Sequence, residues 1–450
     1  MDASHVTDEL TLPRPSAGHW TLPAALRARS LAAPLGTAAL LAMLVSGTAI
    51  AIQAAGGRSL VVPSGHRLPD WLAGAFAGLA PTPGLGRFEA LLVAMTLAYA
   101  VALACVRALP ARRVVFAVVV LHAVFLLAPP LLSTDIFSYA DYARLGALHG
   151  INPYAHGPGS FRHDEAFVYV GHLWRYTPSV YGPLFTLPTY GLALLGLPAT
   201  LWSLKLLAAV ASLVCVALAG RCAQRLGGSP SVAVALVGLN PLLLIYAVGG
   251  GHNDLIMLAA MLGAVALALS QREARAGAAV VAAAAIKVSG LVMLPLMLAA
   301  RVRRARVAAG ALGAAAATIA VGLIAFGGSI FSPFSVLNDI QSGVTAESLP
   351  SEVARLVGVN ANGANFQLLM HVLLAGALIA LVRATWRGMS WITATGWALL
   401  ALAGTATWLV AWYTLWALPF AAITQDRRLV AATLLVEGLF IFHGLAPLLA

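Results

Sequence analysis

Charged side chains are scarce in this sequence of 450 residues, where Asp, Glu, Lys and Arg together make up 10% of the chain. Soluble domains carry about a quarter of their residues as charges and about half as apolar residues. Here 60% of the residues are hydrophobic and the mean hydropathy is +0.89. These values exclude a water-soluble globule. They are typical of a membrane chain, since a spanning helix uses about 20 predominantly apolar residues.

Acidic residues are scarcer still, because 16 Asp and Glu stand against 27 Lys and Arg, for a net charge of +11. In a soluble chain this excess would suggest a nucleic-acid partner. Membrane proteins concentrate Lys and Arg in their cytoplasmic loops, and that explanation accounts for the charge here. We therefore expect a lipid bilayer around the chain and no nucleic acid.

Cysteine is nearly absent. The three cysteines, Cys105, Cys215 and Cys222, lie in or beside apolar runs and show no metal-ligand spacing. Neither a disulfide framework nor a zinc site follows from them. We expect no metal ion and no cofactor.

The alternation of polar and apolar residues that marks a membrane β-barrel is missing from the long Ala/Leu/Val runs. These runs predict an all-α polytopic membrane protein with a single membrane domain over residues 31–450. The preceding segment, 1–30, is polar and carries three arginines, so we expect a cytoplasmic tail and a retained first helix. The predicted spans are 31–55, 89–108, 114–132, 201–220, 231–248, 254–270, 277–300, 307–326, 366–382, 391–410, 412–424 and 429–448.

The basic residues give the orientation. Threading from a cytoplasmic N-terminus places eighteen of the 27 Lys and Arg inside and seven outside, while Lys205 and Lys287 lie within apolar runs. This split favours the threading over its inverse. Two long outer segments, 133–200 and 327–365, then face the periplasm.

The apolar segment 277–300 has basic clusters on both sides, at 272–275 and at 301–306. A single span would place one cluster outside. Two half-length helices turning at 287–290 would keep both inside, each reaching about 17 Å. Re-entrant backbone of this kind is tolerated only inside protein or against a cavity. The pattern predicts a helical hairpin whose tip carries Lys287, which either snorkels to the interface or lies near a lipid phosphate.

The outer segment 133–200 is rich in aromatic residues and histidine. It holds seven of the ten tyrosines and four of the eleven histidines. A merely solvated loop would contain more Ser, Lys and Glu, so we expect a binding surface at the membrane edge. Within the segment, Asp141 stands three residues before Arg144, and this spacing predicts a surface ion pair.

Asp135 opens a helical pattern that ends at Gly150. Tyr139 and Tyr142 follow at i+4 and i+7 and therefore share its face of the helix. Two roles are open for Asp135. It could cap this helix, or it could act as a general base at the membrane–water boundary.

The turn Gly249–Gly250–Gly251–His252–Asn253–Asp254 joins two predicted spans with almost no loop. Three glycines allow close backbone approach, and the three polar side chains then project together at the outer edge. The glycines could form a tight turn after which Asp254 merely starts the next helix. Alternatively, His252 could donate a hydrogen bond to an anionic leaving group and Asp254 could share the base role. The His-x-Asp pair alone is too weak a signal for a metal site.

Two stretches rich in proline and glycine, 150–158 and 176–183, predict rigid turns. Tyrosines on rigid turns can offer flat faces to sugar C–H groups and hydroxyls to sugar hydroxyls. An interfacial aromatic belt explains the tyrosines equally well, but it does not explain the Asn and His residues beside them. The candidate binding residues of these turns are Asn152, Tyr154, His156 and Tyr181.

Together these motifs resemble a known family. The motifs are Ser133–Thr134–Asp135-x-x-Ser138–Tyr139, His149–Gly150–Ile151–Asn152–Pro153–Tyr154, Tyr181–Gly182–Pro183, Asn240–Pro241 and Gly249–Gly250-x-His252–Asn253. They resemble the actinobacterial polyprenol-phosphomannose-dependent α-1,6-mannosyltransferases of the C-type glycosyltransferase superfamily. The resemblance covers about residues 31 to 448.

The resemblance implies a bundle of about 12–13 transmembrane helices with a large periplasmic first loop and a periplasmic active site. It also implies polyprenyl-phosphate mannose as the donor and a growing lipomannan, anchored in lipid, as the acceptor. The acidic catalytic residue of the superfamily maps onto Asp135. Ile136 follows it where the superfamily often has a second acid, which argues against a metal-dependent form.

The residues fit such a transfer on chemical grounds. A lipid-phosphate sugar is already activated, so the enzyme needs one carboxylate to take the acceptor proton and cationic or donor groups to hold the departing phosphate. Single-displacement inversion is the expected outcome. The alternative is a transporter or flippase of a lipid-linked sugar, although no internal repeat is visible. A non-catalytic scaffold would leave Asp135 replaceable.

Overall fold

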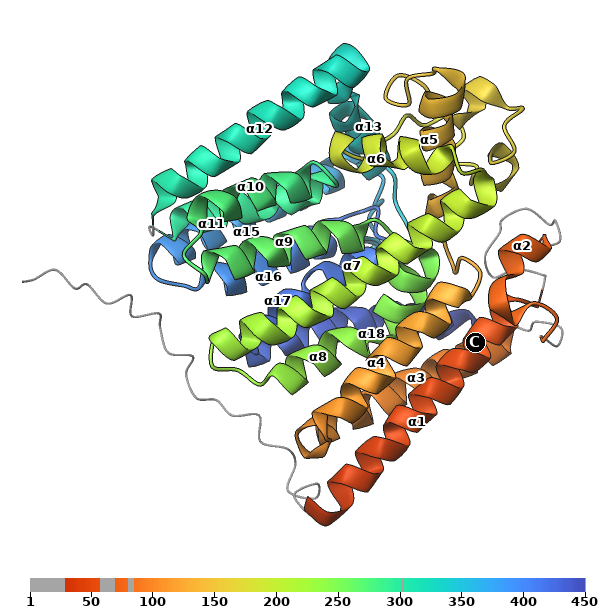
Figure 1. The fold of residues 1–450 in the computed structure, drawn as a ribbon. Coiled ribbons are helices and arrows are strands. Elements are labelled where there is room, and N and C mark those ends of the chain that lie inside the picture. The colour runs from red at the N-terminus through yellow and green to blue at the C-terminus, as the bar shows by residue number, and fades with distance from the viewer. Residues whose placement is uncertain (1–28, 57–68, 80–84, 301–302, 450) are drawn as a thin grey trace, which may run out of the picture.

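The computed structural model describes residues 29–56, 69–79, 85–300 and 303–449. The predicted cytoplasmic tail, 1–30, lies almost entirely outside the described residues. Helices make up the regular structure of the described part, which contains no strand, so the prediction of an all-α membrane protein is confirmed. Figure 1 shows a bundle of helices with irregular turns gathered at one end.

In Figure 1 the first part of the chain runs from one corner of the bundle, in red and orange, to its centre, in green. Its helices are α1 (Arg29–Ala54), α2 (Asp70–Ala73), α3 (Leu85–Cys105), α4 (Ala111–Leu127), α5 (Asp135–His149), α6 (Pro183–Ala193), α7 (Leu197–Arg225), α8 (Pro230–Gly238) and α9 (Asp254–Ala268). Shorter helical turns link several of them.

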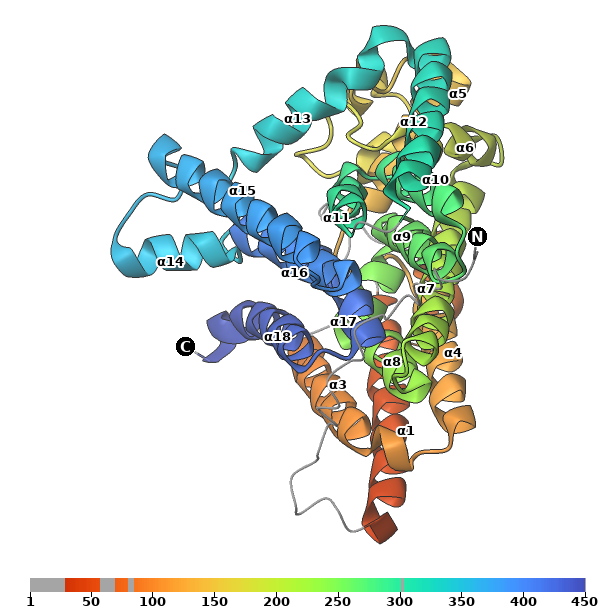
Figure 2. The same ribbon diagram turned by 90° about the vertical axis from the view of Figure 1, so that its left-hand side faces the viewer.

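The second half of the chain completes the bundle and adds a layer that stands apart on one side in Figure 2. Its helices are α10 (Glu273–Ala284), α11 (Met293–Ala299), α12 (Arg304–Phe326), α13 (Ser332–Gln341), α14 (Leu349–Val357), α15 (Ala364–Trp386), α16 (Trp391–Thr405), α17 (Leu418–Thr424) and α18 (Arg427–Leu449). The separate layer consists of α13, α14 and α15.

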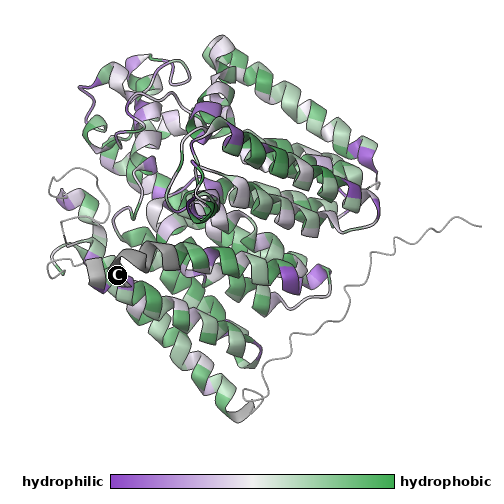
Figure 3. Cartoon of the chain, turned by 180° about the vertical axis from the view of Figure 1, so that it is seen from behind, coloured by the Kyte–Doolittle hydropathy of each residue, from purple (hydrophilic) through white to green (hydrophobic). Residues whose placement is uncertain are grey.

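Five helical segments of the described chain are long and apolar enough to cross a membrane: Leu31–Ala54, Arg87–Ala108, Leu197–Arg225, Arg304–Gln341 and Ala364–Trp386. Figure 3 shows the matching pattern, with hydrophobic residues along the helices and hydrophilic residues at the helix ends and around α5. Shorter apolar helices pack between the long ones. The chain is therefore built to sit in a bilayer.

Several predicted spans end early or break. The span predicted over 114–132 ends at Leu127, because Pro129 and Pro130 cannot continue the helix. The span over 231–248 breaks before Pro241 into α8 and a π-helical turn, Leu243–Val248. The spans 391–410 and 412–424 are likewise wrong in their bounds, since α16 ends at Thr405 and a 3-10 helical turn, η9 (Ala411–Trp416), precedes α17.

The predicted hairpin over 277–300 is confirmed. Helix α10 ends at Ala284, a short helical turn runs over Val288–Val292, and α11 returns the chain. Arg303, which follows α11, donates a 3.0 Å hydrogen bond to Glu273 at the start of α10. Both ends of the hairpin therefore lie on the same side of the bundle, where α10 and α11 lie side by side (Figure 1). Lys287 lies at the tip, between the end of α10 and the turn Val288–Val292.

The two outer segments are not open loops. Segment 133–200 contains α5 and α6, and segment 327–365 contains α13 and α14. The proline- and glycine-rich turns between α5 and α6 are tied to the hairpin tip, because the backbone N–H of Gly182 donates to Ile286 O at 3.0 Å. A Cβ atom at Gly182 would collide with the carbonyl of Ala285, so only glycine allows this approach.

Candidate active site

A cavity of about 690 Å³ lies where α5, the hairpin tip, the layer of α13 and α15, the end of α16, and η9 meet. Among the sequence candidates, Asp135, Tyr181 and Lys287 line it. The other walls are mostly aromatic and aliphatic. They include Leu173, Trp174, Leu337, Ile340, Met370, Leu374, Leu402, Trp408, Trp412, Tyr413 and Trp416.

Asp135 is the first residue of α5, and its side chain does not cap that helix. Thr134 takes the N-cap position, and no side-chain cap bond is formed. The backbone N–H of Asp135 instead donates to Oγ of Ser133 at 3.1 Å, and the side chains of Ser133 and Trp174 lower the pKa of the Asp135 carboxyl. The residue is 7% exposed and faces the cavity. The geometry therefore favours the general-base interpretation over the capping one.

Burial raises the pKa of Asp135 to about 6. The positive charge of Lys287 opposes this increase, while the negative charge of Asp254 adds to it. A carboxylate with this pKa is ionised at neutral pH, yet it is more basic than an exposed one. That is the range in which a carboxylate works well as a general base.

His252 lies behind Asp135. Its Nδ1 atom is 3.6 Å from Oδ2 of Asp135, and its ring stacks on Trp412 with centroids 3.7 Å apart. The side chain has no exposed surface and does not line the cavity. Both ring nitrogens lack a hydrogen-bond partner among the described residues. A direct bond from His252 to a leaving group, one of the expected roles, is therefore not provided by this geometry.

Lys287 and Asp254 form a buried ion pair. The ammonium donates to both carboxylate oxygens of Asp254, at 2.8 Å and 2.9 Å, and Trp416 Nε1 donates to the same carboxylate at 2.7 Å. The ammonium also lies 4.8 Å from the centre of the Tyr413 ring and 5.4 Å from that of Trp416. Asp254 is thus occupied by its partners, whereas Lys287 still lines the cavity.

The glycine turn brings these groups together. Gly249 and Gly250 pack against Leu131, where a Cβ atom at Gly249 would lie 2.7 Å from the Leu131 side chain. Gly251 has φ +71°, a conformation that favours glycine. The expected close approach is confirmed, and it sets His252 and Asp254 beside the segment that leads to Asp135.

Most of the remaining candidates stabilise the outer segment rather than line the cavity. The Tyr142 hydroxyl donates to Thr177 O at 2.7 Å, and the Tyr154 hydroxyl donates to Tyr181 O at 2.7 Å. Asn152 donates to Phe326 O at 2.9 Å. None of these candidates, nor exposed His156, lines the cavity.

Tyr139 and Asn253 lie just behind the cavity wall. The hydroxyl of Tyr139 is 3.4 Å from Oδ1 of Asn253, and its ring meets that of Tyr181 edge to face at 4.8 Å. Both side chains are buried and are absent from the cavity lining. They support Tyr181, which does line the cavity.

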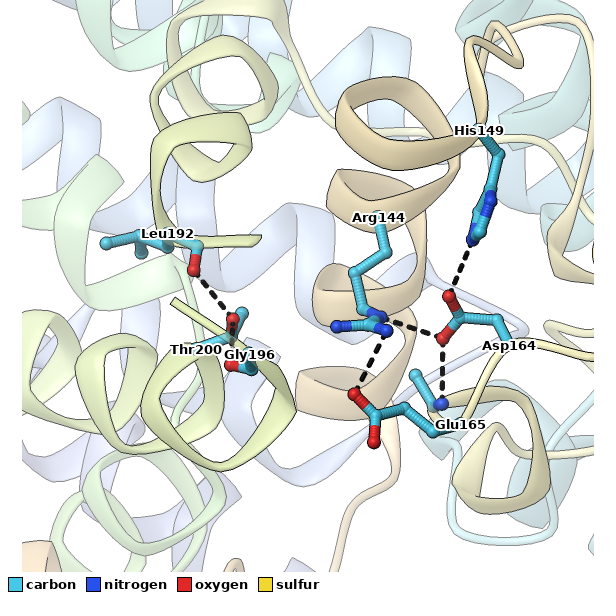
Figure 4. A network of polar contacts seen from close by, with 8 residues as sticks. Arg144, His149, Asp164, Glu165, Leu192, Gly196 and Thr200 are labelled. Carbon is cyan, nitrogen blue, oxygen red and sulfur yellow. Dashed lines mark hydrogen bonds and ion pairs between the residues drawn. The ribbon is translucent and has the colours of Figure 1, made fainter. Parts of the chain in front are cut away.

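A second polar network holds the turns that follow α5 against that helix (Figure 4). Asp164 accepts a 2.8 Å bond from Arg144 and a 2.7 Å bond from His149. Burial alone would raise the pKa of Asp164, but these bonds hold it below its ordinary value. The predicted pair of Asp141 with Arg144 is wrong, because Asp141 has no exposed surface and Arg144 binds Asp164 and Glu165.

The sequence interpretation missed the aromatic wall formed by Trp174, Trp412, Tyr413 and Trp416. The last three lie in η9, a stretch that looks like part of an apolar span. The available signal was the density of large aromatic residues within five positions of an uncharged segment. In the described part of the chain, no group of three or more His, Cys, Asp or Glu is arranged to hold a metal ion.

Comparison with known proteins agrees with the geometry. Residues 33–303, more than half of the chain, match the family model described as alpha-(1->6)-mannopyranosyltransferase, N-terminal domain. An alpha-(1->6)-mannopyranosyltransferase A of Mycobacterium tuberculosis is 28% identical over 338 residues, which cover 68% of this chain and 65% of the relative. No solved structure matches the chain.

Two further relatives match shorter stretches. Another alpha-(1->6)-mannopyranosyltransferase of Mycobacterium tuberculosis is 36% identical over 32% of this chain and 25% of its own length. The alpha-(1->6)-mannopyranosyltransferase A of Corynebacterium glutamicum is 26% identical over 41% of this chain and 38% of its own length. The matched regions thus span between a quarter and just under two thirds of these curated relatives. With more than half of its length matching the family model, this chain belongs to the alpha-(1->6)-mannopyranosyltransferase family.

Proposed function

We propose that this protein transfers mannose from polyprenyl-phosphate mannose to a lipid-anchored mannan, forming α-1,6 linkages by single-displacement inversion. One observation carries the proposal. Asp135, a buried carboxylate, and Lys287, a partly buried ammonium, line the same cavity beside the layer of α13 and α15. That is the set of groups needed to activate an acceptor hydroxyl and to hold the phosphate of a lipid-linked sugar.

In this proposal Asp135 is the general base. The acceptor hydroxyl gives its proton to the carboxylate as its oxygen bonds to the anomeric carbon of mannose from the face opposite the phosphate. The anomeric C–O bond to phosphate breaks, and the bonding electrons leave with the phosphate. The transition state resembles an oxocarbenium ion, and a β-linked donor gives an α-linked product.

Lys287 is the group that holds the departing phosphate. Phosphate is a good leaving group without protonation, so a fixed positive charge is the help that it needs. Asp254 and Trp416 keep the ammonium in place at the hairpin tip. We assign Asp254 this supporting role because its carboxylate is already engaged by both partners.

The mannose ring would lie along the aromatic wall between base and phosphate. Trp412 stacks on His252, which in turn lies 3.6 Å from Asp135. At the other end of the wall, Tyr413 stacks on Trp416 and contacts Lys287. A hexose that reaches from Lys287 to Asp135 must therefore pass across these rings, whose faces suit its C–H groups.

The polyprenyl chain would leave the cavity along its apolar side. Leu337 and Ile340 of α13, Met370 and Leu374 of α15, and Leu402 of α16 line that side. Helix α15 is also the least covered of the membrane helices, with 6% of its apolar window buried. A lipid tail can thus leave the site between these apolar side chains, with Gln341, Gln367 and His371 on the same walls.

We place the site on the periplasmic face of the plasma membrane. The charge split of the sequence puts 133–200 outside, and Asp135 belongs to that segment. A donor held by a lipid and an acceptor held by a lipid would meet at this boundary.

A direct test uses the purified full-length protein in liposomes with radiolabelled polyprenyl-phosphate mannose and a synthetic mannoside. We expect an elongated product, cleaved by an α-1,6-specific mannosidase, with release of polyprenyl phosphate. The transporter alternative predicts movement of the intact donor across the bilayer with no elongation. That result would contradict the proposal.

A further inference from the structure

Lys205 is a buried cation whose role the transfer chemistry does not explain. It lies near the start of α7 and is 1% exposed. Its ammonium, which has three N–H donors, lies within hydrogen-bond distance of four backbone carbonyls: Phe125 at 2.9 Å, Ala128 at 2.6 Å, Pro129 at 3.3 Å and Gly249 at 3.0 Å. It does not line the cavity.

Phe125 lies in the last turn of α4, and Ala128 and Pro129 follow that helix directly. A helix leaves its last carbonyls without intrahelical partners, and its dipole makes that end negative. Because Pro129 and Pro130 follow the helix, no N–H group of these two residues can satisfy them. The ammonium of Lys205 supplies the missing donors. Burying an ammonium costs free energy unless its N–H groups are all hydrogen-bonded. The burial of Lys205 is therefore explained by the carbonyls that its ammonium binds.

The fourth carbonyl, that of Gly249, belongs to a distant part of the sequence. It also accepts a 3.1 Å bond from the backbone N–H of Leu131. Lys205 therefore joins two backbone segments that both lead to the site. The segment 128–134 continues directly into Asp135, and the turn after Gly249 carries His252 and Asp254.

We propose that Lys205 is a positioning residue for the transferase. By tying the end of α4 to Gly249, it sets the Asp135 carboxylate in register with His252 and, through Asp254, with Lys287. This inference rests on the proposed role of Asp135 as general base. Lys205 touches no substrate and acts only through the two backbone segments.

The first test replaces Lys205 by methionine, an unbranched side chain that is one atom shorter than lysine and has no hydrogen-bond donor. A displacement of the base by about 1 Å can cost about 100-fold in rate, so we expect kcat to fall by about 10- to 100-fold. The KM for the donor should change by less than about threefold, because the cavity walls remain in place. An unchanged kcat in an active preparation would overturn the inference.

The matched control is Thr200→Val, on the same helix and equally buried. The Thr200 hydroxyl donates at 2.8 Å to the carbonyls of Leu192 and Gly196, and neither segment leads to the site (Figure 4). We expect near-normal kcat from this variant. A loss equal to that of Lys205→Met would show a general effect of α7 packing and contradict a positioning role.

A second test does not depend on transferase activity. Cysteines replacing Leu131 and Gly249 would face each other, since a Cβ atom at 249 lies 3.2 Å from the Leu131 Cβ. A disulfide needs about 3.5–4.5 Å, so the two segments need to part by only a few tenths of an ångström to form one. With Lys205 present the disulfide should form readily; with Lys205→Met, or with the bulkier Lys205→Arg, it should form more slowly. Closing it should also restore kcat to Lys205→Met. Equal cross-linking rates with Lys, Met or Arg at position 205 would overturn the inference, whichever sugar donor the enzyme uses.

Discussion

The two carboxylates nearest the cavity have different surroundings, and the difference divides the chemistry between them. Asp135 is buried, faces the cavity and has its pKa raised to about 6, with burial as the main cause. Asp254 is bonded to Lys287 and Trp416 behind the wall. This difference is the one expected if Asp135 is the base and Asp254 supports Lys287, as we propose.

The raised pKa of Asp135 predicts a pH dependence. The base works only when ionised, so protonation below its pKa should stop transfer. We expect kcat/KM to rise with pH through about 6 and then level off toward pH 8. The measurement is the initial rate against pH in liposomes. Asp141→Asn is the control, and its rate should rise over the same pH range. A profile that is flat through this range would contradict the assignment.

The aromatic wall predicts a specific loss in sugar recognition. Stacking contacts of aromatic rings contribute about 0.5–1.5 kcal/mol beyond area burial, or about 2- to 13-fold in affinity. Trp412→Leu should therefore weaken binding of polyprenyl-phosphate mannose by about that factor and leave binding of polyprenyl phosphate nearly unchanged. Tyr246→Leu is the control, since that ring packs on Phe440 and does not line the cavity. Equal weakening of both ligands by Trp412→Leu would place the sugar elsewhere.

Among the secondary-structure elements, α5 and the hairpin show how far local sequence can predict a site. The capping signals around Asp135 and Gly150 predict α5 with its observed bounds, and the flanking arginines predict the hairpin. Both signals are local. The partners of Asp135 are not, because His252, Trp174 and Trp412 come from three other segments, and nothing in the sequence states which segments meet. The roles of Lys205 and η9 were hidden for the same reason.

Helix α5 also contains an acid whose burial has a measurable cost. Asp141 has no exposed surface; burial, with Asp164 nearby, raises its pKa to about 8. Between the ordinary pKa of 3.8 and the raised pKa of about 8, the folded state binds a proton that the unfolded state releases, so stability falls as pH rises through this window. Asp141→Asn removes that penalty without changing size.

We therefore expect Asp141→Asn to raise the apparent Tm in detergent by about 2 °C or more at pH 8, with a smaller effect near pH 5. The readout is the melting midpoint measured across this pH range. A lower midpoint for the variant at pH 8 would show that the ionised carboxylate is stabilising, contrary to the account.

At the scale of the whole molecule, composition alone predicts an all-α membrane protein. The arrangement of its helices depends on where the apolar runs of the sequence are broken. Pro129, Pro241 and the glycine turn interrupt runs that hydropathy joins. Pro129 and the glycine turn lie beside the segments that carry Asp135 and Asp254, so two of these three breaks fall beside the site. An active site needs irregular backbone, and in a membrane such backbone occurs where it is buried in protein or lines a cavity.

The proposed orientation predicts which exposed residues a reagent can reach. Ser160, beyond α5, and Ser342, beyond α13, are both exposed. Single cysteines there should react with an impermeant thiol reagent in cells stripped of the outer envelope. Gln224, exposed at the opposite end of α7, should be protected until the membrane is opened. Labelling of a cysteine at 224 with protection at both other sites would invert the orientation.

The most direct test of the account is the activity of Asp135→Asn. The amide keeps the size of the side chain but cannot accept the proton, so we expect normal expression and donor binding with turnover reduced by about 10²- to 10⁴-fold. Asp254→Asn is the matched variant at the other carboxylate. It should weaken the ion pair that positions the Lys287 ammonium and raise the KM for the donor. If Asp135→Asn retains most of its transferase activity while Asp254→Asn loses it, the base is Asp254 and the account is wrong.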